Sequence, residues 1–130
     1  MIGLDTNIIV RYLVQDDPMQ TRKAIACIGR LTEGRPGFIS LIVIAETAWI
    51  LKTGYRLTNA VIAAAIERLL QASELVVQNE RQVFYAVALA KQGRASVADA
   101  LIGVLGSQAG CDHTLTFDRK AARLPEFELL

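Results

Sequence analysis

Short apolar runs separated by long helical patterns constrain this chain more than any other feature of its sequence. A few runs have the length and composition of β-strands, and longer stretches between them have the spacing and end signals of α-helices. Strands that alternate with helices form parallel sheets, because each helix carries the chain back to the starting edge by a right-handed crossover. We therefore predict an α/β fold: a three-layer α/β/α sandwich with a parallel central sheet.

The end signals place the expected elements along the chain. The strand candidates are Ile2–Leu4, Phe38–Leu41, the segment ELVVQ around Val76, and Leu115–Phe117. The helix candidates are Thr6–Val14, a segment from Asp17 and Pro18 to the TEGRPG stretch, Ile42–Thr53, Thr58–Leu70, a segment from Glu80 to Gly93, and one from Ser96 to Gly110. Asp17 is a capping residue type and proline suits the first helical position, while glycine is a typical helix stop.

Length and composition indicate a single globular domain over residues 1–130. The chain has 52% hydrophobic residues, no repeat and no linker, which argues against disorder. It lacks both a signal-peptide pattern and an apolar stretch of about 18 residues, so we expect a cytoplasmic protein. Cys27 and Cys111 are too few for a disulfide framework, and we expect both to be small buried hydrophobes. The net charge of +1 does not discriminate between partners.

Two aspartates follow apolar strand candidates directly. Asp5 comes after the first run, and Asp118 ends the segment TLTFD. Functional sites of open α/β sheets lie at the carboxyl ends of the strands, so if these two strands are parallel, both carboxylates meet at one edge. The alternative for Asp5 is a simple helix cap.

Glu46 and Asp99 stand among apolar residues at helical spacing. The neighbours of Glu46 three and four positions away are Ile42, Val43, Trp49 and Ile50. We therefore expect Glu46 on a buried stripe, where an unpaired carboxylate costs several kcal/mol or protonates. Asp99, in SVADALIGVLG, is likewise expected on a core-facing helix. The structural alternatives are a buried ion pair for Glu46 and a capping box opened by Ser96 for Asp99.

Four carboxylates gathered in one crevice require a cation to remain ionised together. Oxygen ligands suit Mg²⁺ or Mn²⁺, whereas zinc sites recruit Cys or His, and His113 is the sole histidine. Such ions stabilise the charge that develops during displacement at phosphorus. The sequence therefore predicts hydrolysis of a phosphodiester.

The chain resembles the PIN-domain ribonucleases, most closely the VapC-type toxins of type II toxin-antitoxin systems. The resemblance rests on LDTNIIVRYLVQDDP, AETAWIL, VADALIG and GCDHTLTFDRKAARLP, in this order. It implies a Mg²⁺-dependent endoribonuclease whose acidic metal site falls on Asp5, Glu46, Asp99 and Asp118. Thr116 matches a hydroxyl position suited to orienting a water, or is an ordinary strand residue.

The resemblance also assigns Asn7, in the DTN motif, to the acids or the substrate, with capping of the first helix as the alternative. Many relatives carry a further acid where this chain has Ser96, and a hydroxyl is a weaker ligand, which puts a second metal ion in doubt. The resemblance further implies a homodimer and a small antitoxin that covers the active site.

Outside the four acids, basic side chains exceed acidic ones, since the chain has 14 Lys and Arg and 13 Asp and Glu. We expect Arg11, Arg119, Lys120 and Arg123 to contact RNA phosphates, with an ordinary solvated surface charge as the alternative for each. The segment from Ile42 to Leu70 is unusually apolar, and we expect an antiparallel helix pair that forms either a dimer face, a groove for a partner helix, or simply core.

Two other functions are compatible with the sequence. One is a Mg²⁺-dependent phosphatase that uses Asp5 as nucleophile. Asn7 counts against it, because the second acid of a D-x-D motif is missing. The other is a non-catalytic RNA- or protein-binding module with the nuclease fold.

Overall fold

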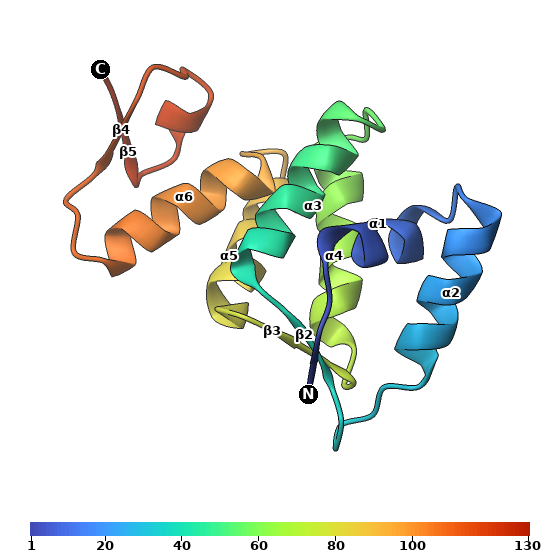
Figure 1. The fold of residues 1–130 in the computed structure, drawn as a ribbon. Coiled ribbons are helices and arrows are strands. Elements are labelled where there is room, and N and C mark those ends of the chain that lie inside the picture. Colours follow the sequence, from blue (N-terminus) through green and yellow to red (C-terminus); the bar gives the residue numbers. More distant parts are fainter.

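The computed structural model describes all residues, 1–130, and shows strands alternating with helices (Figure 1). In chain order the elements are β1 (Ile2–Gly3), α1 (Thr6–Val14), α2 (Pro18–Gly29), β2 (Gly37–Ile39), α3 (Leu41–Thr53), α4 (Asn59–Gln71), β3 (Leu75–Val77), α5 (Glu80–Lys91), α6 (Val97–Gln108), β4 (Thr114–Thr116), a 3₁₀ turn (Ala121–Arg123) and β5 (Phe127–Leu129). The predicted α/β fold with a parallel sheet is confirmed.

Side-chain caps explain why five of the six α-helices begin where the sequence predicts, all except α5. Asp17 accepts a hydrogen bond from the backbone N–H of Gln20 at 3.0 Å, with Pro18 as the first residue of α2. Ser96 accepts one from the N–H of Asp99 at 3.1 Å at the start of α6. Each cap satisfies a backbone donor that the first helical turn leaves free.

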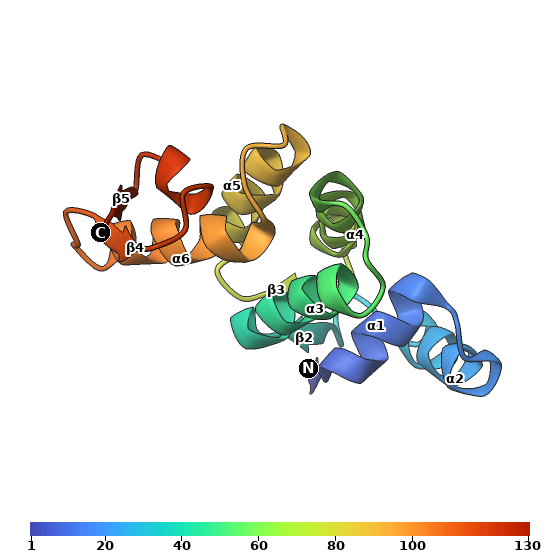
Figure 2. The same cartoon turned by 90° about the horizontal axis from the view of Figure 1, so that it is seen from above.

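The strands form two separate sheets. β1, β2 and β3 are hydrogen-bonded in that order and are all parallel, whereas β4 pairs in parallel only with β5. Figures 1 and 2 both show β4 and β5 at one end of the molecule, beyond α6, with β1 near its middle. The first and last long strands therefore do not share a sheet edge within this chain, so the condition under which Asp5 and Asp118 would meet at one edge is not fulfilled here.

A core of 24 buried residues joins the first sheet to the helices. In the view of Figure 2, α4 and α5 lie along one side and α1, α2 and α3 along the other. β2 packs closely against its neighbours at Gly37, where an added Cβ would lie 2.8 Å from side-chain carbons of both Leu4 and Leu31. This strand therefore requires glycine for packing.

The two cysteines lie in different surroundings. Cys27 is half-buried and packs against the core, but Cys111 is exposed in the turn after α6, so the prediction that both are buried is wrong. Cys111 is exposed because β4 and β5 leave the main body at this turn. No helix is both long and apolar enough to cross a membrane.

Candidate metal and nucleic-acid site

The predicted acids lie at strand ends and in helices near their N-termini, but they form two pairs. Asp5 and Glu46 line one cavity of about 320 Å³, which we call the acidic cavity. Asp99 and Asp118 line another of about 290 Å³, which we call the basic cavity because four cationic side chains also line it. Neither cavity contains a member of the other pair.

Asp5 caps α1 at the carboxyl end of β1, and its Oδ1 accepts from the N–H of Thr6 at 2.7 Å. The buried Thr6 hydroxyl donates to Oε1 of Glu46 and so ties α1 to α3. Asn7 also lines this cavity. Asp5 can therefore cap α1 and still bind an ion, because its second carboxylate oxygen accepts no hydrogen bond from the protein.

Glu46 lies on the exposed face of α3, and the prediction of a buried stripe is wrong. Its neighbours Ile42 and Trp49 are 78% and 63% exposed. The core face of α3 consists of Ile44, Thr47, Ala48 and Leu51. Apolar residues occupy both faces of this helix, so spacing alone selects the wrong one. No ion pair in the structure involves Glu46, which removes the buried-pair alternative.

Asp99 occupies the first turn of α6 and is half-buried, less enclosed than predicted, because Ile102 one turn on is exposed. The Ser96 hydroxyl oxygen accepts a hydrogen bond from the Asp99 N–H, but the Asp99 carboxylate accepts none from the Ser96 N–H. The capping box is thus half formed. The Asp99 carboxylate remains available to face the cavity.

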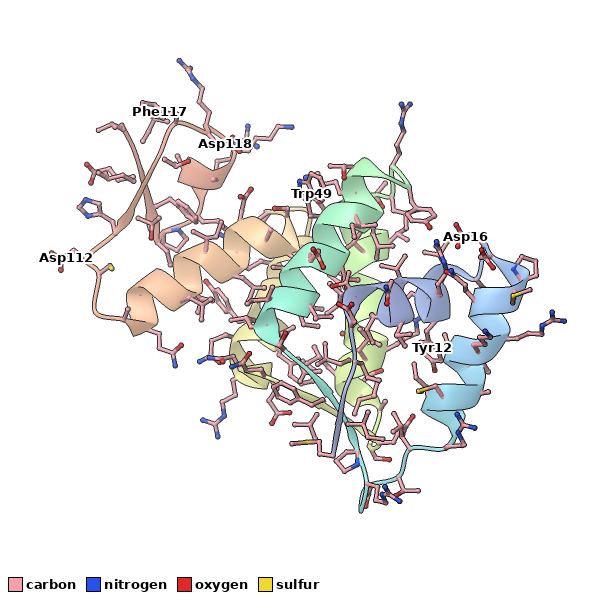
Figure 3. All side chains as sticks on the ribbon, in the orientation of Figure 1. Tyr12, Asp16, Trp49, Asp112, Phe117 and Asp118 are labelled. Atoms are coloured by element: carbon pink, nitrogen blue, oxygen red, sulfur yellow. The ribbon has the colours of Figure 1, made fainter.

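Asp118 follows β4 in an exposed turn, near one end of the molecule in Figure 3. Its Oδ1 accepts from the N–H of Lys120 at 2.8 Å, and its own N–H donates to Oγ1 of Thr116 at 3.0 Å. These two bonds fix the carboxylate relative to β4. The Thr116 hydroxyl accepts here, so its proton stays free for another acceptor.

The basic cavity contains more cationic than anionic side chains. Four cations line it beside its two carboxylates: Lys52, Arg94, Lys120 and Arg123. Such a surface attracts phosphate groups through charge-assisted hydrogen bonds. Lys120 and Arg123 were predicted to contact phosphates, whereas Lys52 and Arg94 were not, because nothing in their local sequence distinguishes them from ordinary surface charges.

The other predicted phosphate contacts have different surroundings. Arg11 lines the acidic cavity but is already engaged: its guanidinium donates to Gln20 at 2.7 Å, to Asp16 at 3.0 Å and to the Tyr55 hydroxyl at 3.1 Å. The Tyr55 hydroxyl, with help from Arg11, lowers the pKa of Asp16. Arg119 is exposed and lines neither cavity. The Arg11 guanidinium is therefore engaged by three other side chains, and its contact with RNA phosphate stays a prediction.

The donor chemistry fits a hard divalent ion, although only two carboxylates meet in either cavity. No three His, Cys, Asp or Glu side chains come together in the structure. His113 pairs instead with Glu128 at 3.3 Å. Mg²⁺ is commonly held by one or two carboxylates plus water and phosphate oxygens, so Asp5 and Glu46 of the acidic cavity supply suitable ligands, while Asp99 and Asp118 lie outside it. The physical reason for the division is that β4 pairs with β5 rather than with β1.

This chain is a parallel α/β domain with carboxylates at its strand ends and a cation-lined cavity, and these groups are ones that metal-dependent chemistry at phosphate can use. The PIN domain family model matches residues 2–126, and the chain belongs to this family. PIN domains are generally metal-dependent nucleases that use divalent ions such as Mg²⁺. No curated protein matches the chain.

Proposed function

We propose that this protein is a Mg²⁺-dependent endoribonuclease, with Mn²⁺ as a substitute ion, and that it acts in the cytoplasm as the toxin of a toxin-antitoxin pair. The observation that supports the nuclease is the set of four carboxylates, each beside a strand end or a helix start in a PIN domain. The toxin assignment rests on the resemblance to VapC-type proteins.

Asp5 and Glu46 would hold the ion, and Asp99 and Asp118, which line a separate cavity in the single chain, would complete its ligand set where the two cavities meet. Bound there, the ion supplies a Lewis acid that neutralises charge on a phosphate oxygen. The Thr6 hydroxyl orients Glu46 toward the acidic cavity. Thr116, whose oxygen already accepts from the Asp118 N–H, has its proton available to orient the attacking water.

The cations of the basic cavity would bind the RNA backbone. Lys120 and Arg123 follow Asp118 closely, so a phosphate bound to them lies near the carboxylates. Arg119 adds charge outside the cavity, and Asn7 contacts substrate from the acidic cavity. Phosphate contacts of this kind fix the position of RNA without reading its bases.

The test is cleavage of a mixed RNA pool by purified protein free of any partner, with Mg²⁺, with Mn²⁺ and with EDTA. Asp99→Asn should abolish metal-dependent cleavage while the protein remains folded by circular dichroism. Asp112→Asn is the matched control, because Asp112 is exposed on the loop after α6 and lines neither cavity (Figure 3). Cleavage that survives Asp99→Asn, or no cleavage by the unaltered protein at any ion concentration, favours a binding module instead.

The toxin role has a separate test. Expression of the unaltered chain should arrest growth, and co-expression of the neighbouring gene product should restore it. Asp99→Asn should not arrest growth. Arrest by that variant would show that the toxicity, if any, does not come from the carboxylate site.

A further inference from the structure

Both sheets end in an unpaired strand edge. The N–H of Ile2 in β1 donates to the carbonyl of Pro36, just before β2, at 3.0 Å, and the N–H of Leu4, just after β1, donates to Phe38 of β2 at 2.9 Å. Backbone groups alternate in direction along a strand, so the N–H and C=O of Gly3 point away from β2. Gly3 is exposed, and no strand lies on that side of β1. The first sheet is therefore open at β1.

β4 has the complementary arrangement. The Thr114 N–H donates to Glu126 at 2.7 Å, and the Thr116 carbonyl accepts from Leu130 at 2.8 Å. These bonds face β5, so the N–H and C=O of Leu115 face the other way, where no strand lies. The second sheet is therefore open at β4.

The two open edges carry apolar side chains without the charges that usually protect an edge strand. Ile2 is 47% exposed beside the first edge, and Leu115 is 55% exposed on the second. Phe117, just beyond β4, is 82% exposed and points outward in Figure 3. Both edges thus have the character of surfaces that pair with another strand.

The C-terminal unit, residues 111–130, is held on its own α6 in a way that keeps β4 from β1 of the same chain. Gly103 lies against the ring of Phe127, where an added Cβ would come within 2.7 Å. Gly106 lies equally close to Thr114. The Tyr85 hydroxyl of α5 also donates to Glu126. To reach its own β1, the unit would have to break these contacts or carry α6 with it.

We propose that two copies of this chain complete each other's sheet, with β4 of each adding in parallel to β1 of the other. The combined order is β3-β2-β1 followed by β4 and β5 of the partner subunit. Both open edges of both copies are used, so the assembly closes as a two-fold dimer and does not grow into a fibre.

Parallel addition assembles the acids. Asp5 lies two residues beyond β1, and Asp118 lies two residues beyond β4. Adjacent strands are about 4.8 Å apart, so these carboxylates would meet at one edge, within reach of a single ion. Antiparallel addition would leave them at opposite ends. The metal site is then incomplete in one chain and is completed by Asp118 of the partner subunit.

Charge complementarity supports the second copy as the occupant. The one cation of the acidic cavity, Arg11, is already paired with Asp16, so Asp5 and Glu46 are left without a cationic partner. The basic cavity beside β4 has an excess of cations. Joining the edges brings opposite charges together and places phosphate-binding groups next to the ion-binding ones.

The first test measures mass in solution by light scattering. The unaltered protein should have twice the chain mass of 14.2 kDa. Leu115→Pro removes an N–H that faces the open edge of β4, so β4 can no longer pair fully with β1 of the other copy and the protein should be a monomer. The β4–β5 bonds are untouched, so the C-terminal unit should stay folded. Leu129→Pro is the matched control, since its N–H faces the outer edge of β5, and this variant should stay dimeric. A monomeric unaltered protein, or dissociation by Leu129→Pro alone, would overturn the proposal.

The second test does not depend on a proline variant. Asp5→Asn and Asp118→Asn chains with different tags are co-expressed, and mixed dimers are isolated through both tags. Each mixed dimer has one site without either acid and one intact site, so it should recover about half of the unaltered activity, although each variant alone is inactive. No recovery in a confirmed mixed dimer would show that each site is built within one chain.

This inference rests on the proposed nuclease function for the activity readout and for the choice of parallel over antiparallel addition. If the unaltered protein cleaves no RNA but the mass measurements behave as expected, the nuclease proposal fails and the strand exchange stands. If cleavage occurs while the unaltered protein is monomeric, the strand exchange fails and the nuclease stands.

Discussion

Gly103→Ala tests how the C-terminal unit is held, because two opposed effects of similar size meet at this position. Gly103 is a buried residue inside α6. A Cβ built there lies 2.7 Å from Cε2 of Phe127 and 3.1 Å from Cβ of Glu126. Carbon atoms in favourable contact are about 3.5–4.0 Å apart, so the ring must move by roughly 1 Å.

The sizes of these two effects decide whether Gly103→Ala raises or lowers the free energy of unfolding. Replacing glycine by alanine in a helix interior stabilises it by about 1 kcal/mol, chiefly through backbone entropy. Overpacking a well-packed contact costs about 1–3 kcal/mol. We therefore expect Gly103→Ala to lower the free energy of unfolding by up to about 2 kcal/mol. Gly29→Ala is the control: its Cβ meets nothing within 4 Å at the end of α2, so this change should be neutral or stabilising.

The assay is urea denaturation followed by circular dichroism, in the unaltered protein and in a Phe127→Ala background. Without the ring most of the overlap disappears, so Gly103→Ala should become stabilising there, with a coupling of about 1–3 kcal/mol between the two sites. If Gly103→Ala stabilises the unaltered protein as Gly29→Ala does, the ring does not lie on α6. The anchoring of the C-terminal unit would then be refuted.

Three further predictions concern buried and titrating groups. Thr47 is fully buried and its hydroxyl has no partner, so Thr47→Val should raise the free energy of unfolding by about 1 kcal/mol in urea denaturation. The hydrogen bond to Glu126 raises the pKa of Tyr85; this bond stabilises below about pH 10 and is lost as pH rises through the raised pKa, so Tyr85→Phe should flatten the alkaline stability profile. The Tyr55 hydroxyl lowers the pKa of Asp16; that stabilisation is present above the ordinary value of 3.8 and is lost as pH falls below it, so Asp16→Asn should flatten the acid limb of a thermal-melting series.

Local signals explain what the sequence could predict. α1 has the predicted bounds, Thr6–Val14, because its cap lies next to it in the chain. The predicted starts of the other capped helices are within a few residues for the same reason. β5 was missed because the three residues Phe127–Leu129 carry no alternation long enough to be recognised. Turn and cap chemistry acts over a few residues, so it marks where an element begins, whereas the pairing of strands depends on distant segments.

The arrangement of the candidate site depends on choices that are not local. The partner of β4 is decided by the balance between its contacts with β5 and α6 and any pairing with β1, and no residue within β4 specifies that balance. The exposed face of α3 is likewise set by what packs on it. The sequence singled out the acids by residue type and position, but it placed Glu46 on the wrong face of α3 and could not show whether β4 lies beside β1.

If the metal site joins Asp5 of one copy to Asp118 of the partner subunit, as proposed, then metal binding and dimer formation are coupled equilibria. Without an ion, four carboxylates at one edge repel each other, and keeping Asp118 away from Asp5 in the free chain relieves that repulsion. An ion that binds only the joined site stabilises the dimer by about 1.4 kcal/mol per site at ten times its dissociation constant. With two sites, Mg²⁺ should lower the dimer dissociation constant about a hundredfold. Sedimentation at increasing Mg²⁺ measures this shift, Asp5→Asn should abolish it, and a dimer that forms equally well in EDTA would show that the carboxylates and the strand edges are not coupled.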